Sequence, residues 1–183
     1  EKTYRLDRLG IPLIEIGTAP DIKSPEQCQE TARKLGMLLR SLPGVKRGLG
    51  TIRQDVNVSI KGGARIEVKG AQDLRQIPLL VKLEVKRQVE LLKLRKEIKK
   101  RLGKDIKLSI TNLTETFKKT KCEFIKKALK NKQFNVVGTK LSNFAGFLGK
   151  EIQPGKRLGK ELAEYAKVKT GIGGIIHSDE KLE

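Results

Sequence analysis

Alternation between apolar and polar residues runs through Thr51-Ile-Arg-Gln-Asp-Val-Asn-Val-Ser-Ile-Lys-Gly-Gly-Ala-Arg-Ile-Glu-Val-Lys69. Successive side chains of a strand point to opposite faces, so this pattern predicts two strands, each with one apolar face on which Gln54 is the only polar residue. Gly62-Gly63 predicts a hairpin turn between them. We expect the three-residue loop 62–64, because it sets Ile60 opposite Ile66 and Val58 opposite Val68 and so keeps one face apolar.

The other face of the predicted hairpin is polar and carries charges of both signs. It holds carboxylates, cations and neutral hydrogen-bonding groups: Arg53, Asp55, Asn57, Ser59, Arg65, Glu67 and Lys69. Asp and Asn are poor strand formers, and a mixture of carboxylates with fixed cations suits metal and phosphate binding. This polar face is therefore a candidate site. A solvated outer face is the alternative that the pattern leaves open.

A further carboxylate, Glu15, stands among aliphatic residues upstream. The segment Ile11-Pro-Leu-Ile-Glu-Ile-Gly17 predicts a strand with Pro12 near its start, where a missing donor is tolerated. A carboxylate in an apolar strand costs free energy unless it is paired or bound to a cation. Glu15 is thus a second candidate site residue, and an edge strand with Glu15 facing water is the alternative.

Two helices are expected around the hairpin. Ser24-Pro-Glu-Gln27 has the residues typical of a helix start, and an apolar stripe that should pack on the sheet follows: Cys28, Ala32, Leu35, Leu38, Leu39 and Leu42. Leu42-Pro43-Gly44 should end this helix. A longer helix, strongly basic in its second half, is predicted from Leu79 to Leu102 and would connect the first part of the chain to the second.

After Gly103 the pattern changes to that of a second, small unit. We expect strands at 107–110, 134–141 and 171–177 (the last buried), helices at 114–129 and 158–168, and a glycine-rich loop at 143–149. The predicted fold class is therefore α+β, with a boundary between residues 102 and 103.

The charge of the chain is strongly positive. Its 183 residues hold 40 Lys/Arg against 21 Asp/Glu, a net charge of +19, and 23 Lys/Arg against 10 Asp/Glu fall in residues 93–183. Such a field indicates a polyanionic partner, nucleic acid first of all. With no Trp and few other aromatic residues, contacts should be mainly to phosphates, with an affinity that falls as salt rises. A Lys-rich thermophile surface is the alternative, although such surfaces usually match Lys with Glu.

Composition also limits the other classes of function. Cys28 and Cys122 are too few and too isolated for a disulfide framework or a zinc site, which favours a reducing cytosol. His177 is the only histidine, so a multi-histidine metal site is excluded. The chain starts without Met, and its sequence contains no apolar run long enough to span a membrane. We interpret it as a piece of a longer protein.

Several ordered blocks carry a resemblance to a known family. They are Asp7-Arg8-Leu-Gly-Ile-Pro-Leu-Ile-Glu15-Ile, Pro20-Asp21-Ile-Lys-Ser-Pro-Glu26, Ile52-Arg-Gln-Asp-Val-Asn-Val-Ser59 and Arg65-Ile-Glu-Val-Lys69. Together they resemble the tRNA-dependent amidotransferase B/E family. Gly70-Ala-Gln72 and Gly50-Thr51 are similar to the archaeal E-type branch. Lys150 to Arg157 and Gly173 to Glu180 resemble an insertion domain shared with bacterial-type aspartyl-tRNA synthetases.

The resemblance implies a domain organisation and an enzymatic activity. Residues 1–102 would be the later part of a cradle-shaped catalytic domain with a mixed sheet, and residues 103–183 the insertion domain. The family phosphorylates the glutamate of misacylated glutamyl-tRNA(Gln) with ATP and then amidates it. The ammonia comes from an asparaginase-like D-type partner, and in the archaeal branch two D and two E subunits would form a cytoplasmic heterotetramer.

The same resemblance assigns roles to individual residues. Glu15 and Glu67 would bind Mg²⁺, and with Arg53, Asp55 and Asn57 would form the catalytic set. Arg8, Lys69 and Ser59 would bind the nucleotide phosphates. The family's earlier metal-binding segment precedes residue 1, so the fragment should be inactive alone. The rival interpretations are the B-type protein of the three-component amidotransferase and a non-catalytic, basic tRNA-binding or assembly module.

Overall fold

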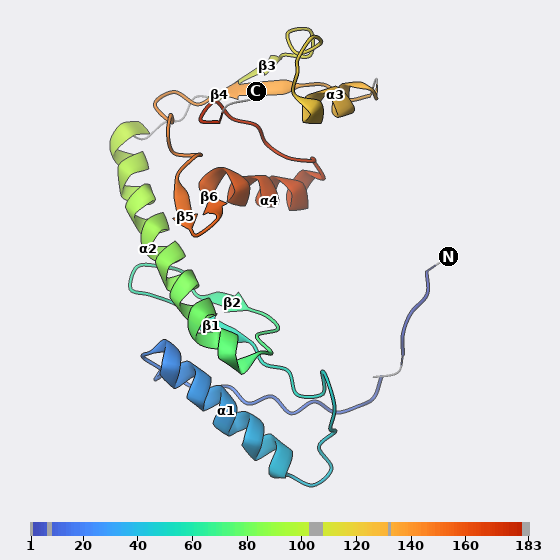
Figure 1. Ribbon diagram of the computed structural model, residues 1–183, viewed down its shortest axis with the longest axis vertical. Helices are drawn as coiled ribbons and strands as arrows, with labels where there is room; N and C mark the ends of the chain where they lie inside the picture. Colours follow the sequence, from blue (N-terminus) through green and yellow to red (C-terminus); the bar gives the residue numbers. More distant parts are fainter. Residues whose placement is uncertain (1, 7–8, 103–107, 132, 181–183) are drawn as a thin grey trace.

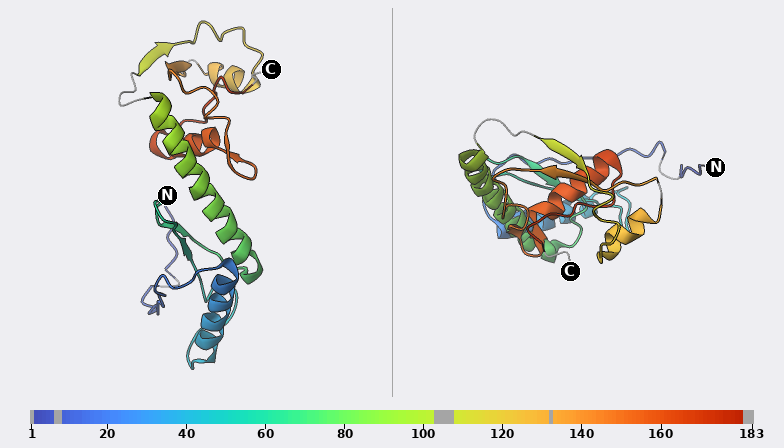
Figure 2. Two further views of the ribbon diagram at one scale, coloured as in Figure 1. Left: turned by 90° about the vertical axis from the view of Figure 1, so that its left-hand side faces the viewer. Right: turned by 90° about the horizontal axis from the view of Figure 1, so that it is seen from above.

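The computed structural model describes residues 2–6, 9–102, 108–131 and 133–180, and its helices and small antiparallel sheets confirm the α+β class. The longest element, α2 (Ile77–Leu102), runs between two groups of elements, as predicted (Figures 1 and 2). Helix α1 (Pro25–Ser41), the short 3₁₀ helix η1 (Leu74–Gln76) and the first sheet lie at one end of α2. No described helix is both long enough and apolar enough to cross a membrane.

The start of α1 follows from its local sequence. The Ser24 hydroxyl caps the helix by accepting a hydrogen bond from the Gln27 N–H at 3.0 Å, and Pro25 occupies the first turn. Cys28 and Ala32 pack against the core of the first sheet as predicted, whereas Leu38 and Leu42 are exposed. Burial raises the pKa of the Cys28 thiol, as expected for a core position.

The first sheet is the predicted hairpin, formed by β1 (Val56–Val58) and β2 (Ile66–Val68). The predicted register is wrong by two residues, because Val58 lies opposite Ile66 and Val56 opposite Val68. A shift of two residues leaves the faces unchanged, so the separation of apolar from polar side chains is confirmed. The loop is longer than expected because Gln88 of α2 donates to the Val58 carbonyl at 3.1 Å, and because Gly63 N–H closes a turn on the Ile60 carbonyl at 2.9 Å.

The second group of elements contains two more hairpins and two helices. Strands β3 (Ser109–Asn112) and β4 (Val137–Lys140) pair with each other, as do β5 (Glu151–Gln153) and β6 (Lys156–Arg157). Helix α3 (Glu123–Leu129) is shorter than the predicted 114–129, and α4 (Leu158–Thr170) agrees closely with the prediction. Every strand pair of the described residues is antiparallel, so the expected mixed sheet is not observed there.

Two predicted strands are wrong. Residues 11–17 form an exposed extended segment with no sheet partner among the described residues, and a strand needs a neighbour to pair its backbone groups. Residues 171–177 are neither a strand nor largely buried. There the backbone at Gly173 and Gly174 lies against the ring of Phe124, where a β-carbon would be 3.5 Å from Cζ.

Helix α2 contributes to both hydrophobic cores of the molecule. Ile77 is buried with Val56, Val58 and Ala71 beneath the first hairpin. Seventeen residues further along the helix, Leu94 is buried in a core with Phe147, Ile152 and Leu158. The two groups of elements are therefore packed on one continuous helix.

Candidate functional site

The polar face of the first hairpin brings two carboxylates to one lysine. Lys69 Nζ lies 3.3 Å from Glu67 Oε2 and 3.9 Å from Asp55 Oδ2. Asp55 Oδ1 also accepts a hydrogen bond from the Gly70 N–H at 2.8 Å, which fixes the position of its carboxylate. All three side chains are substantially exposed, so a ligand has access to them.

Asn57 lies on the same polar face, and Arg53 and Ser59 are close to it along the chain. Asn57 stands directly opposite Glu67 in the strand pair. Arg53 and Ser59 lie on either side of β1, and all three residues are exposed. Within residues 9–102, no hydrogen bond or ion pair engages these three side chains. Of the eight predicted site residues, Asp55, Asn57, Glu67 and Lys69 are thus brought together on the hairpin, and Arg53 and Ser59 are exposed on either side of β1.

The remaining two predicted site residues are not part of this cluster. Glu15 lies on the exposed segment that precedes α1, outside any helix or strand. Its side chain makes no hydrogen bond or ion pair to the hairpin in the part of the chain that the structure describes. Arg8 lies outside the described residues. The assignment of Glu15 and Arg8 to the site remains a prediction.

Two glutamines, whose role the sequence pattern did not reveal, hold the base of the hairpin. Gln72 Oε1 accepts a hydrogen bond from the Gln54 N–H at 3.0 Å, and Gln72 Nε2 donates to the Ile52 carbonyl at 3.2 Å. Gln54 Nε2 donates to the Ala71 carbonyl at 2.6 Å. Gln54 therefore occupies the apolar face because its amide replaces strand pairing where β1 and β2 diverge. A polar residue on the apolar face was the only feature of the sequence that indicated these glutamine hydrogen bonds.

The donor set of the polar face suits magnesium only in combination with a phosphate ligand. Among the described residues, no three His, Cys, Asp or Glu side chains are grouped so that they could hold a metal ion. Mg²⁺ is usually held by one or two carboxylates and completes its octahedron with water and substrate phosphates. Asp55, Glu67 and the amide oxygen of Asn57 fit that requirement. Lys69 is the cation beside them that could contact a phosphate oxygen.

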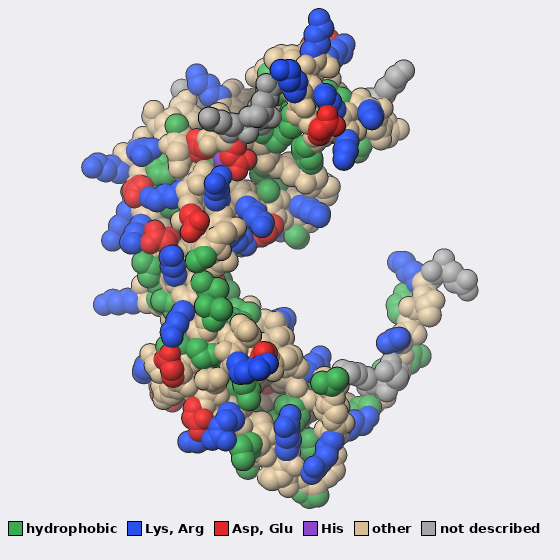
Figure 3. Space-filling view, in the orientation of Figure 1, with side chains coloured by type: hydrophobic (Ala, Val, Ile, Leu, Met, Phe, Trp, Pro, Cys, Tyr) green, Lys and Arg blue, Asp and Glu red, His purple; other side chains and the backbone are tan. Residues whose placement is uncertain are grey.

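The surface around this hairpin is rich in Lys and Arg. Figure 3 shows these side chains over both groups of elements, with a hollow between the groups on the side that faces away from α2. In the second half of α2, Lys93 forms an ion pair with Glu90 at 2.7 Å. Glu97 of the same half pairs at 3.0 Å with Lys150, which lies outside the helix. Within the described residues, the other Lys and Arg side chains of this half have no ion pair. The positive charge predicted for this region is therefore largely uncompensated on the helix itself.

Comparison with known proteins gives a consistent result. The E subunit of glutamyl-tRNA(Gln) amidotransferase from Methanocaldococcus jannaschii is 55% identical over 177 residues, which are 97% of this chain and 28% of that protein. Proteins of the same name from Pyrococcus abyssi (54% over 182 residues, 98% of this chain and 28% of that protein) and Sulfurisphaera tokodaii (51% over 184 residues, 98% and 29%) are also similar. The chain thus spans less than a third of the length of these relatives.

A model of the GatB/GatE catalytic domain matches residues 1–137, a range that includes the extended segment with Glu15 and the whole polar face of the first hairpin. The match confirms the resemblance that the ordered sequence blocks indicate. The chain belongs to the GatB/GatE catalytic domain family.

Proposed function

We propose that the chain is part of the E subunit of an archaeal-type glutamyl-tRNA(Gln) amidotransferase, an ATP-dependent carbon–nitrogen ligase. The observation that carries this proposal is the identity of 51–55% to relatives of that name along 97–98% of the chain. The proposed reaction transfers the γ-phosphoryl group of ATP to the side chain of tRNA-bound glutamate, and ammonia then displaces the phosphate to give glutaminyl-tRNA(Gln).

The polar face of the first hairpin would perform the phosphoryl transfer. Bound Mg²⁺ would neutralise charge that develops on the phosphoryl oxygens. The carboxylates of Asp55 and Glu67 would hold the ion, and Asn57 would complete the set of oxygen donors. Lys69 now lies between both carboxylates, and its ammonium group, with Arg53, would contact the phosphates. Glu15 and Arg8 would join the site from the extended segment.

The partners of this activity are proposed from the family and from charge. An asparaginase-like D-type partner would supply the ammonia, in a cytoplasmic assembly of two D and two E subunits. The basic second half of the chain would face tRNA(Gln). Its balance of 23 Lys/Arg against 10 Asp/Glu supports a phosphate-directed contact.

The substitution Glu67→Ala in the full-length parent protein tests the proposed site. The assay follows formation of glutaminyl-tRNA with the asparaginase-like partner, ATP, Mg²⁺ and glutamyl-tRNA(Gln). We expect a fall in kcat of at least about 100-fold with tRNA binding retained, because a preorganised electrostatic contact to the transition state is removed. Lys61→Ala, which removes an exposed cation from the loop of the same hairpin, is the matched control and should amidate like the wild type.

The other outcomes of this assay are informative. Amidation that survives Glu67→Ala would make the polar face structural, and a wild-type parent that forms no glutaminyl-tRNA would remove the proposed activity itself. One observation favours a second candidate function, a non-catalytic tRNA-binding module: Lys69 pairs with Glu67 and Asp55 as it would if these charges only ordered the sheet. Magnesium binding that is lost in Glu67→Ala, measured by calorimetry, would exclude this candidate.

A further inference from the structure

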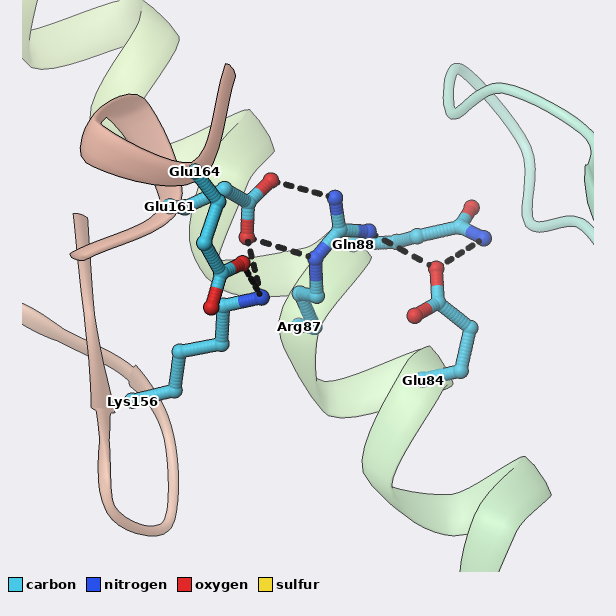
Figure 4. A network of polar contacts seen from close by, with 6 residues as sticks. All are labelled: Glu84, Arg87, Gln88, Lys156, Glu161 and Glu164. Carbon is cyan, nitrogen blue, oxygen red and sulfur yellow. Dashed lines mark hydrogen bonds and ion pairs between the residues drawn. The ribbon is translucent and has the colours of Figure 1, made fainter. Parts of the chain in front are cut away.

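A buried network of charged side chains joins α2 to α4 (Figure 4). Arg87 of α2 donates two hydrogen bonds to Glu161 of α4, from Nε at 2.9 Å and from Nη2 at 2.5 Å. Its third donor, Nη1, reaches Glu84 Oε1 at 2.9 Å. Only 15% of the Arg87 side chain and 9% of the Glu161 side chain are exposed, and the hydrogen bonds to Glu161 raise the pKa of the Arg87 guanidinium.

One end of this network reaches the first hairpin. Gln88, which is buried, donates from Nε2 to Glu84 Oε1 at 3.0 Å and to the backbone carbonyl of Val58 at 3.1 Å. Val58 belongs to β1, in which Asn57 lies on the polar face, and Asp55 immediately precedes this strand. An unbroken series of polar contacts therefore leads from the backbone of the candidate site to Arg87.

The other end reaches the third hairpin. Lys156 of β6 lies 3.8 Å from Glu161 Oε2 and 2.7 Å from Glu164 Oε2. The network borders an open cleft of about 400 Å³, which Ile66 of β2 lines together with Tyr165 and Val168 of α4. The first hairpin and α4 thus face each other across this cleft, and the network bridges them through α2.

The chemistry of the network determines what it can contribute. Apolar contacts such as those of Leu94 favour burial but are not directional, so alone they would allow a range of angles between α4 and the hairpin. A guanidinium that pairs through two parallel hydrogen bonds accepts one geometry, and a buried ion pair with one partner missing leaves an uncompensated charge. The network therefore selects one arrangement of the two groups of elements.

We propose that Arg87 and Gln88 are positioning residues, which fix the second group of elements relative to the polar face of the first hairpin. The consequence for catalysis rests on the proposed function, in which the basic second half contacts tRNA and the hairpin performs phosphoryl transfer. A tRNA held by the second group reaches the polar face with its glutamate in place only when the network is intact.

The test measures geometry and kinetics separately in the full-length parent protein. Spin labels carried by non-native amino acids at the exposed positions 61 in the hairpin loop and 167 in α4 report the distance between the two groups. We expect a single narrow distance distribution in the wild type and a broader one in Arg87→Met. Arg87→Lys keeps the positive charge but cannot donate two parallel hydrogen bonds to Glu161. We expect this folded variant to show a distance distribution of intermediate width. With the complete amidation assay, Arg87→Met should raise KM for glutamyl-tRNA by about tenfold.

The control removes an ion pair from the same helix without touching the network. Lys82→Met breaks the exposed ion pair between Lys82 and Glu26 and should change neither the distance distribution nor KM. An unchanged distribution in both Arg87→Met and Arg87→Lys would overturn the proposal, and so would a broadened distribution with unchanged kinetics. The distance measurement needs no turnover, so a failure of the proposed amidation chemistry can be distinguished from a failure of the network to fix the geometry.

Discussion

At the scale of single residues, Gly63 and Gln88 show how closely the first hairpin and α2 approach each other. A β-carbon at residue 63 would lie 2.4 Å from Gln88 Oε1 and 2.9 Å from Ile60 Cγ1. Gln88 cannot move away freely, because its Nε2 is held by the Val58 carbonyl and by Glu84. The absence of a side chain at residue 63 is therefore a packing requirement.

We expect Gly63→Ala to lower the free energy of unfolding by about 1–3 kcal/mol, the usual cost of overpacking. Urea denaturation measures this change. The control is Gly36→Ala in α1, where nothing lies within 4 Å of the added β-carbon. There the same substitution should raise stability by about 0.5–1 kcal/mol, because alanine favours the helix. Equal effects of the two substitutions would contradict this account of Gly63.

Sequence reasoning at this scale succeeded where a residue's role depends on its neighbours along the chain. The alternation of residues 51–69 places Asp55, Asn57 and Glu67 on one face whatever the register, because a shift of two residues preserves parity. The register itself depends on Gln88, which is 30 residues from Val58. Arg87 and Glu161 are 74 residues apart, and no local pattern indicates that they meet.

At the scale of elements, the carboxylate of Asp179 organises the turn that precedes β5. It accepts hydrogen bonds from the N–H groups of Gly146 at 2.8 Å, Leu148 at 3.0 Å and Gly149 at 3.1 Å. The bonds from Gly146 and Gly149 contribute most to lowering the pKa of Asp179 below its ordinary value of 3.8. A lowered pKa in the folded state means that this contribution to stability is complete at neutral pH and is lost as pH falls through the folded pKa.

Asp179→Asn should therefore lower Tm by a few degrees at pH 7. The difference from the wild type should shrink as pH falls from 3.8 toward the lowered pKa of the folded protein, because the carboxylate of the unfolded chain binds a proton first and protonation then favours unfolding. Thermal unfolding followed by circular dichroism across this pH range measures the effect. Ser178→Ala, at an exposed neighbouring position, should follow the wild type at every pH, and a constant difference for Asp179→Asn would refute the electrostatic explanation.

The elements themselves were predictable to the extent that their signals are local. Ser24 and Pro25 fix the start of α1, and the helical spacing of apolar residues predicted α2 and α4 to within a few residues. Strand pairing is not local, so an aliphatic run such as Ile11 to Gly17 could not show by itself whether a neighbour is present. The pair of β5 and β6 was missed, although Pro154-Gly155 between them is a turn signal.

At the scale of the whole molecule, α2 is the element that both cores share, and its two ends should differ in what they stabilise. Leu94 is 2% exposed and packs against Phe147, Ile152 and Leu158, all from the second group of elements. Ile77 is fully buried beneath the first hairpin. Loss of one core therefore need not abolish the other.

Leu94→Ala should cost about 2–5 kcal/mol, as a leucine truncated in a packed core does. Amide hydrogen exchange should lose protection in β5 and α4, with a much smaller loss in β1 and β2. Leu79→Ala, at a position of α2 that is 53% exposed, should stay within about 0.5 kcal/mol of the wild type. A uniform loss of protection across both groups would instead show that the molecule unfolds as a single cooperative unit.

The shared helix has a practical consequence for anyone who dissects this protein by gene truncation. A polypeptide that stopped after residue 102 would carry a bare apolar stripe, with Leu94 and its neighbours Leu91 and Ile98 stripped of Phe147 and Ile152. Such a stripe favours self-association and poor recovery from expression. A polypeptide that started at residue 103 would keep Glu161 without Arg87. Residues 77–102 therefore need to accompany the second half if that half is to be purified separately, whereas the first half keeps this helix but loses the residues that cover Leu94.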